Sequence, residues 1–147
     1  MLLYTPKENL DQFMYEFNKT ISYGLRSKSD RINRMFGGRY KWCVIQSNQY
    51  FLNCYRYVYQ NPLRAGIVQH CEDYPFSTFH YKAKGKMFVV PLHDRLGFAD
   101  GYKVAWMNRP IKDTEVRAVR NGLYRSILNN LKDDDRRMIP PAESLDG

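Results

Sequence analysis

A tyrosine in the middle of the chain has the setting of a candidate nucleophile. Tyr57 lies in the stretch Arg56–Val68, which reads RYVYQNPLRAGIV. A phenolate oxygen can attack an electrophilic centre and hold the product covalently. Asn61 comes four residues later, so on a helix the two side chains share one face, and Arg56 and Arg64 are near in sequence. A lone tyrosine on a helix is more often structural, so both roles stay open for Tyr57.

The element that carries Tyr57 is predicted to be an amphipathic helix from about Asn48 to Asn61. Ser47 can cap its start, and Pro62 disfavours helical geometry at the preceding residue, so the helix should end at Asn61. The apolar residues that recur at spacings of three, four and seven are Phe51, Cys54, Tyr55 and Val58. Tyr57 is not on that buried face. We therefore expect it in the last turn, half outside the core, with Gly66 ending the short turn after the helix.

A basic stretch with interleaved aromatics precedes this helix. Residues 26–41 contain six cationic residues and one acidic residue, Asp30. The cationic residues are Arg26, Lys28, Arg31, Arg34, Arg39 and Lys41. Phe36, Tyr40 and Trp42 lie among or beside them. Cations that track phosphates, with aromatic faces for bases, suit single-stranded DNA or RNA. The other interpretation is a solvated loop whose aromatics belong to the next strand. Arg56 and Arg64 complete the predicted DNA-binding set.

Composition narrows the class of protein. The 147 residues are 44% hydrophobic, which is enough to bury a core, and the net charge of +8 points to an anionic partner or to a merely soluble basic surface. No run of 18 apolar residues exists, so we expect no membrane span. The three cysteines have no CxxC spacing, which favours packing roles and a reducing, cytoplasmic location over disulfides or zinc.

The sequence predicts no metal site of its own. His70, His80 and His93 stand ten and thirteen residues apart, without the close pairing of metal ligands. A phosphate-binding loop is also missing, because Gly37–Gly38 lacks the Lys-Ser/Thr that such a loop requires.

Local patterns predict the other elements. Thr5–Glu8 resembles a capping box and predicts a helix start, with apolar residues at helical spacing as far as Leu25. Tyr40–Gln46 alternates and predicts a short strand, and Met87–Leu92 reads as a strand or packed extended segment. Asp113 could begin a further helix. The apolar residues that this helix would carry are Val116, Val119, Leu123, Ile127 and Leu131.

Several segments together resemble the single-tyrosine HUH transposases, and most closely their REP-associated branch. The block Arg56–Val68, together with EDYPFSTF at Glu72–Phe79, resembles the C-terminal half of these enzymes. Phe36–Lys41 resembles the family segment F-x-G-R-Y-K, and Leu3–Met14 resembles the segment directly after the family's metal-binding strand. The resemblance covers Met1 to about Phe79.

This resemblance implies that Tyr57, with Asn61, cleaves and rejoins single-stranded or hairpin DNA through a 5′-phosphotyrosine. It also implies a divalent metal, Mg or Mn, held by a His-hydrophobic-His pair on a strand. That pair would lie directly before Met1, and the three histidines present do not replace it. We therefore expect an internal start codon or a truncated element, with catalysis weak or absent. The alternative function is an inactive DNA-binding remnant.

The resemblance also implies a fold and a domain organisation. The fold class expected is α+β, an antiparallel sheet with packed helices, from a ferredoxin-like or RRM-like core truncated at its N-terminus. Residues 1–92 would form the transposase-like domain, 93–138 a helical extension and 139–147 a disordered tail. Family members dimerise or act as monomers, which leaves a homodimer open.

Overall fold

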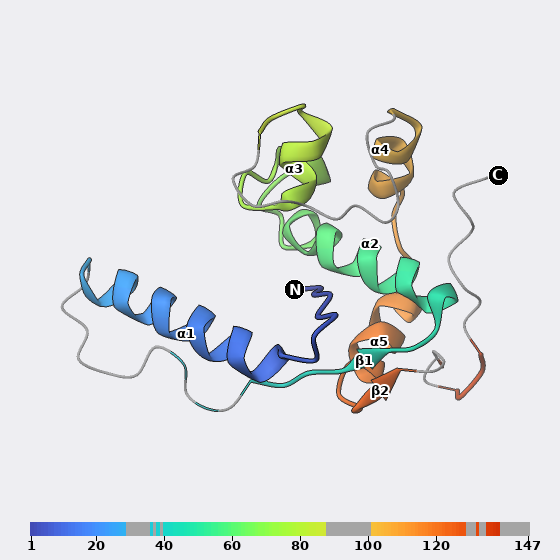
Figure 1. Cartoon of the computed structure of the whole chain (residues 1–147). Helices are drawn as coiled ribbons and strands as arrows, with labels where there is room; N and C mark the ends of the chain where they lie inside the picture. Colours follow the sequence, from blue (N-terminus) through green and yellow to red (C-terminus); the bar gives the residue numbers. More distant parts are fainter. Residues whose placement is uncertain are drawn as a thin grey trace. The chain divides into compact units, whose positions relative to one another are not determined.

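The computed structural model describes residues 1–28, 36, 38, 40–87, 101–128, 132 and 135–138. The chain divides into two compact units, Met1–Trp42 and Cys43–Gly147 (Figure 1). The boundary after Trp42 falls inside the stretch 1–92, which was predicted to form one domain. The predicted tail, 139–147, lies outside the described residues.

The first unit contains one long helix, α1 (Leu10–Arg26). Its apolar residues recur at helical spacing as predicted, and the rings of Phe13 and Phe17 stack with centroids 5.8 Å apart. The predicted start at Thr5 is wrong, because the chain makes a turn there. The Glu8 amide donates to the Thr5 carbonyl over 3.0 Å, and the positive φ of Glu8, 54°, is not helical. The helix begins only after Asn9.

The second unit is built on α2 (Asn48–Arg64), which Ser47 precedes as predicted, although the Ser47 side chain makes no capping hydrogen bond. The predicted end at Asn61 is wrong. Pro62 lies inside the last turn, where its missing amide removes one hydrogen bond without ending the helix.

Gly66, with a φ of 69°, ends α2 itself and not the separate short turn that was predicted to follow the helix. The Ile67 amide donates to the Pro62 carbonyl and the Gly66 amide to the Leu63 carbonyl, each over 3.0 Å. These two bonds form a Schellman motif, which requires a residue in the left-handed region. The turn therefore fixes the end of the helix that carries Tyr57.

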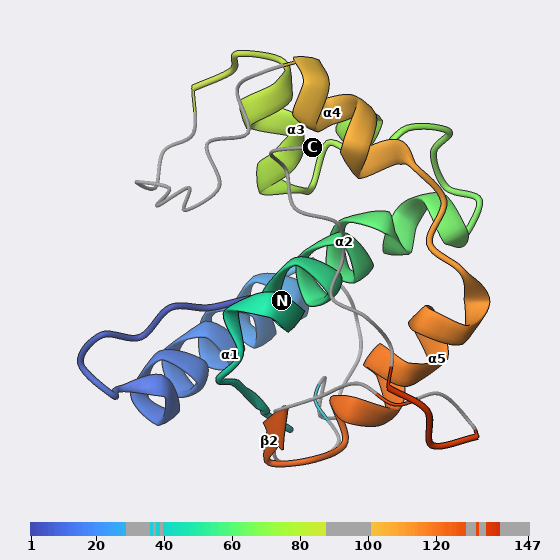
Figure 2. The same cartoon turned by 90° about the vertical axis from the view of Figure 1, so that its right-hand side faces the viewer.

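On one side of α2 lies a helical layer of η1 (Cys71–Asp73), α3 (Thr78–Ala83) and α4 (Gly101–Asn108) (Figures 1 and 2). The core there consists of Cys71, Phe79, Trp106 and Met107. Side chains of α2 that pack against it are Leu52, Tyr55, Tyr59 and Leu63. The aromatic stretch after Glu72 therefore packs back onto α2 through Phe79.

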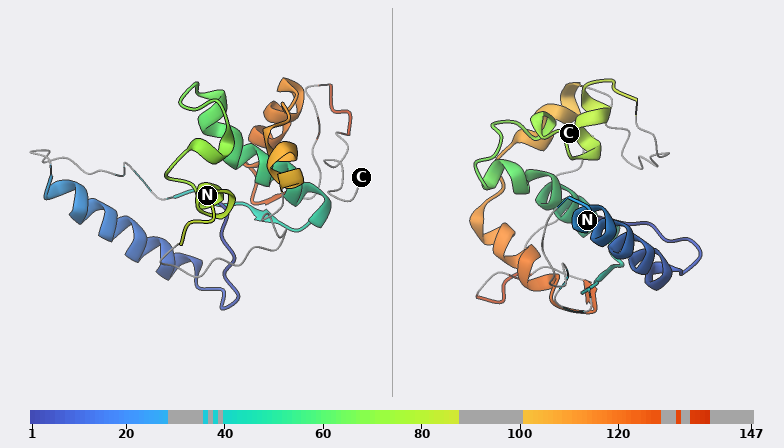
Figure 3. Two further views of the ribbon diagram at one scale, coloured as in Figure 1. Left: turned by 90° about the horizontal axis from the view of Figure 1, so that it is seen from above. Right: turned by 90° about the vertical axis from the view of Figure 1, so that its left-hand side faces the viewer.

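On the other side of α2 lie α5 (Asp113–Gly122) and a short strand pair (Figures 2 and 3). The helix begins at Asp113 as predicted, and Val116 and Val119 are buried. It ends nine residues earlier than the apolar pattern suggested. Ile127 lies in strand β2 (Ile127–Leu128), and Leu131 is outside the described residues.

The predicted antiparallel, ferredoxin-like or RRM-like sheet is wrong. Strand β1 (Val44–Ile45) pairs in parallel with β2, with Val44 opposite Ile127 and Ile45 opposite Leu128. The described residues otherwise contain one isolated bridge, between Lys132 and Met138. Of the predicted strand Tyr40–Gln46, only Val44 and Ile45 pair with another strand. The apolar side chains of this unit are buried mainly between helices. The predicted strand Met87–Leu92 lies, from residue 88, outside the described residues.

Candidate functional site around Tyr57

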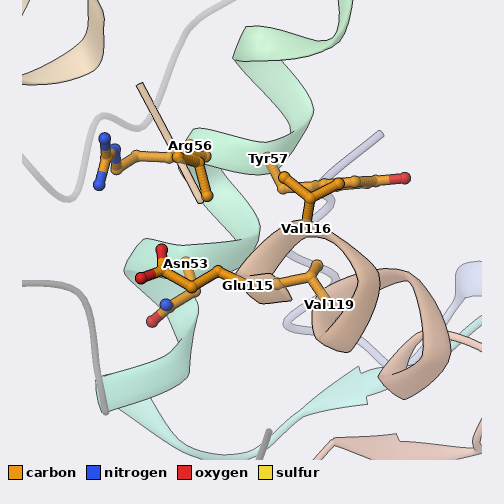
Figure 4. A pocket seen from close by; sticks show the side chains of 7 residues that line it. Asn53, Arg56, Tyr57, Glu115, Val116 and Val119 are labelled. Carbon is orange, nitrogen blue, oxygen red and sulfur yellow. The ribbon is translucent and has the colours of Figure 1, made fainter. Parts of the chain in front are cut away.

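Tyr57 lines a shallow pocket between α2 and α5 (Figure 4). The pocket has an empty volume of about 220 Å³. Three of its residues come from α2, one precedes α5 and three come from α5: Asn53, Arg56, Tyr57, Ile111, Glu115, Val116 and Val119. The tyrosine is half-buried, which agrees with its predicted position outside the main apolar face. Figure 4 shows its hydroxyl pointing away from the Arg56 guanidinium.

Asn61 and Arg64 follow Tyr57 by about one and two turns of α2, so the prediction that Tyr57 lies in the last turn is wrong. The Arg64 guanidinium carbon lies 5.9 Å from the centroid of the Tyr57 ring, and both Arg64 and Asn61 are exposed. A cation over a tyrosine ring at an exposed site contributes about 0.5–1 kcal/mol. A phosphate near Tyr57 would find compensating positive charge in Arg64. The structure thus brings together three of the predicted site residues.

Arg56 points to the opposite side of α2 and is buried. Its Nη2 donates to the Arg109 carbonyl over 2.5 Å, and its guanidinium carbon lies 4.8 Å from the centroid of the Trp106 ring. Gln60, one turn further along α2, donates from Nε2 to the carbonyls of Met107 and Arg109 over 2.6 and 2.8 Å. Both side chains therefore hold the carbonyl end of α4. A DNA contact from Arg56 would require this interaction to open.

The polar attachment of α4 continues through Asn108. Its Oδ1 accepts from the Cys71 amide over 2.8 Å, and its Nδ2 donates to a Glu72 carboxylate oxygen over 2.7 Å. Sequence reasoning missed these contacts because they join residues 37 and 36 positions apart. The polar character of Gln60 and Asn108 does not indicate which residues they hydrogen-bond with.

The basic residues predicted to bind DNA are distributed over both units. Arg26 ends α1, and Arg26, Lys28 and Lys41 are exposed in the first unit. The remaining members of the stretch, Arg31, Arg34 and Arg39, lie outside the described residues. Of the aromatics, Phe36 is exposed, whereas Tyr40 donates its hydroxyl hydrogen to the Asp11 carboxylate. The DNA-binding role of these exposed cations stays a prediction.

The described residues do not form a site for a divalent metal. Within the described ranges, no group of three His, Cys, Asp or Glu side chains could hold one. His80 is buried, with Nδ1 2.6 Å from the Glu72 carbonyl oxygen and Nε2 3.1 Å from Lys86 Nζ. His70 is exposed, and His93 lies outside the described residues.

The thiols are also unsuited to nucleophilic chemistry. Burial, with a smaller contribution from the nearby Cys43, raises the pKa of Cys54 to about 12. Burial is the main cause that raises the pKa of Cys71 to about 11, and it also raises the pKa of Cys43. A thiol of this kind stays protonated at neutral pH and is a poor nucleophile. Cys54 and Cys71 are buried and unbridged, as the packing role predicted for them requires.

Comparison with protein-family models, curated proteins and solved structures found no match to this chain. Among the described residues, no helix is both long and apolar enough to cross a membrane.

Proposed function

We propose that this chain is a DNA-binding protein of the single-tyrosine transposase type, whose ligand is single-stranded or hairpin DNA. The observation that carries the proposal is the grouping of Tyr57, Asn61 and Arg64 along the C-terminal half of α2. The net charge of +8 and the exposed cations Arg26, Lys28 and Lys41 support it, because they would attract a polyanion. A cytoplasmic location and a homodimer belong to the same proposal.

The chemistry proposed for Tyr57 is a phosphodiester exchange. Its hydroxyl oxygen attacks the phosphorus, and the bond between phosphorus and the 3′ oxygen breaks. The 5′ phosphate stays on Tyr57, while the proton lost by the phenol balances the one gained by the leaving 3′-hydroxyl. The reverse step joins a new strand end, so the bond energy is conserved and no nucleotide is consumed. Cleavage belongs to the proposal only where a Mg or Mn site is supplied.

A second candidate is binding without cleavage. It is favoured by His80, whose two ring nitrogens are both engaged inside the protein. In this case the chain holds DNA through its basic residues, and Tyr57 contributes only to packing between α2 and α5.

A covalent-capture experiment separates the two candidates. Full-length protein is incubated with a hairpin oligonucleotide labelled at its 3′ end, in the presence of Mg or Mn, and run on a denaturing gel. Cleavage by Tyr57 leaves the labelled fragment attached to the protein, and Tyr57→Phe removes this adduct.

The control is Tyr59→Phe. The Tyr59 hydroxyl hydrogen-bonds with the Thr78 hydroxyl on the other side of α2, so this variant should keep the adduct. An adduct that persists in Tyr57→Phe would exclude Tyr57 as nucleophile. Salt-sensitive binding with no adduct in the unsubstituted protein would select the binding-only candidate.

A further inference from the structure

The outward face of α5 is basic and polar in its C-terminal half, after an exposed acidic residue, Asp113, in the first turn. Arg117, Arg120 and Asn121 are all exposed, and their spacing places them within one turn on one side of the helix. The residues of α5 buried against the rest of the unit are Val116, Ala118, Val119 and Gly122. Because α5 packs on α2 through that apolar side, the arginine face is turned toward solvent.

An exposed aromatic residue, Tyr124, follows this face directly in the sequence. The Tyr124 amide donates to the Asn121 carbonyl over 3.3 Å and the Arg125 amide to the Gly122 carbonyl over 3.0 Å, so a tight turn comes directly after the helix. The Tyr124 side chain is 73% exposed. An exposed aromatic side chain close in sequence to arginines offers a flat surface to a sugar or base.

The charge of the face is of one sign over its C-terminal half. From Val116 to Leu128 the chain has three arginines and no acidic residue. Asp113 lies one turn before Arg117, so it affects only the start of the face. Glu115 belongs to the pocket, where Figure 4 shows its side chain extending toward α2 beside Asn53.

The support beneath α5 is well defined. The Val44 amide donates to the Ser126 carbonyl over 2.9 Å, and the β1–β2 pair begins immediately after it. The Cys43 thiol lies 3.9 Å from the Gly122 carbonyl oxygen at the end of the helix. A helix held in this way presents its side chains at low entropic cost on binding.

We propose that the exposed face of α5, formed by Arg117, Arg120, Asn121 and Tyr124, is a second DNA-contact surface that takes double-stranded DNA, such as the stem of a hairpin. The inference rests on the proposed function and deepens it. Duplex DNA fits this face because a major groove admits one α-helix, arginine pairs with phosphate or guanine, and asparagine pairs with adenine. The Tyr57 end of α2 then serves the single-stranded part of the ligand.

The test compares two probes on the full-length protein, a blunt DNA duplex and a single strand of equal length. Fluorescence anisotropy is measured over a range of salt concentrations. Arg117→Ala/Arg120→Ala should weaken duplex binding by about tenfold and reduce the salt slope by about two, since each arginine on a phosphate contributes about one. Binding of the single strand should be unchanged.

Two controls separate a contact from a change in net charge or in helix stability. Lys7→Ala/Lys19→Ala removes the same charge from exposed positions of the first unit and should leave duplex binding unchanged. Arg117→Lys/Arg120→Lys keeps the charge of the helix, so it should retain the salt slope and lose only the sequence preference that bidentate arginines provide.

The outcomes distinguish this inference from the proposed function. If the single strand binds but the alanine pair leaves duplex binding unchanged, the inference is overturned while the proposed function stands. If neither probe binds, both are overturned. If the alanine pair instead abolishes binding of a polyglutamate peptide and leaves duplex binding intact, the face takes an acidic protein and the inference is overturned.

Discussion

Two arginines of the same helix, α2, have different roles because they lie on different sides of it. Arg56 is buried against Trp106 and holds the end of α4, whereas Arg64 is exposed over the Tyr57 ring. The sequence placed both in the DNA-binding set because both flank Tyr57. It could not separate them, because the partner of Arg56 lies 53 residues away.

Arg56→Ala should destabilise the protein by about 2–4 kcal/mol, because it removes a charge-assisted hydrogen bond and the contact with Trp106. Urea unfolding monitored by far-UV circular dichroism measures the change. Arg64→Ala, the matched exposed arginine, should change stability by no more than about 1 kcal/mol and instead weaken DNA binding. Equal stability of Arg56→Ala and the unsubstituted protein would show that Arg56 does not hold α4.

The buried thiols predict how stability depends on pH. The pKa of Cys54 is raised from 9.0 to about 12, and the pKa of Cys71 from 9.0 to about 11. Between pH 9 and the raised pKa of each thiol, the folded state therefore binds more protons than the unfolded state. Stability from this source is full below pH 9 and falls as pH rises through 11 and 12, by at most about 1.4 kcal/mol per pH unit for each thiol. Urea unfolding between pH 8 and 10.5 measures the slope.

The control for this prediction is Cys54→Ala. It lowers stability at every pH because it leaves a small cavity, but it should reduce the pH slope as well. A slope that is the same in Cys54→Ala and in the unsubstituted protein would contradict the assignment to this thiol.

At the level of elements, local signals predicted helices and failed for the sheet. Ser47 and Asp113 mark the starts of α2 and α5 correctly. The local signal at Thr5 failed, because the chain makes a turn there and α1 begins only after Asn9. The β1–β2 pair joins Val44 to Ile127, 83 positions apart, and no local pattern encodes that pairing. The pocket between Tyr57 and α5 was not predicted because it also joins residues far apart in the sequence. Val116 and Val119 were expected only on a buried helix face.

Gly66 offers a test of how α2 ends. Its φ of 69° suits glycine, and a Cβ there would meet no atom within 4 Å, so the cost of Gly66→Ala is conformational alone. We expect a loss of about 1–2 kcal/mol, and a smaller loss for Gly66→Asn, which tolerates this region better. Thermal unfolding measures both.

Gly24→Ala is the matched control. Gly24 lies inside α1 with a helical backbone and equally open surroundings, so alanine there should increase helix content by circular dichroism. A Gly66→Ala variant as stable as the unsubstituted protein would contradict the Schellman motif.

At the scale of the whole molecule, the buried residues lie in one part of the chain. All buried residues that the structure describes fall between Tyr50 and Leu128, and none belongs to α1. A fragment Cys43–Gly147 should therefore keep the near-UV circular dichroism of Trp106 and unfold cooperatively. Full-length Trp42→Phe is the reference, since it removes the other tryptophan. Loss of the Trp106 signal in the fragment would show that Met1–Trp42 contributes to the core.

The net charge of +8 supports the central proposal, that this chain binds single-stranded or hairpin DNA. The most direct measurement is the affinity of the full-length protein for a single strand as a function of salt concentration. We predict that log K falls linearly with log[salt], with a slope of about −2 to −4, as expected for about three to six phosphate contacts on a single strand. Affinity that does not change with salt, or no binding at low salt, would contradict it.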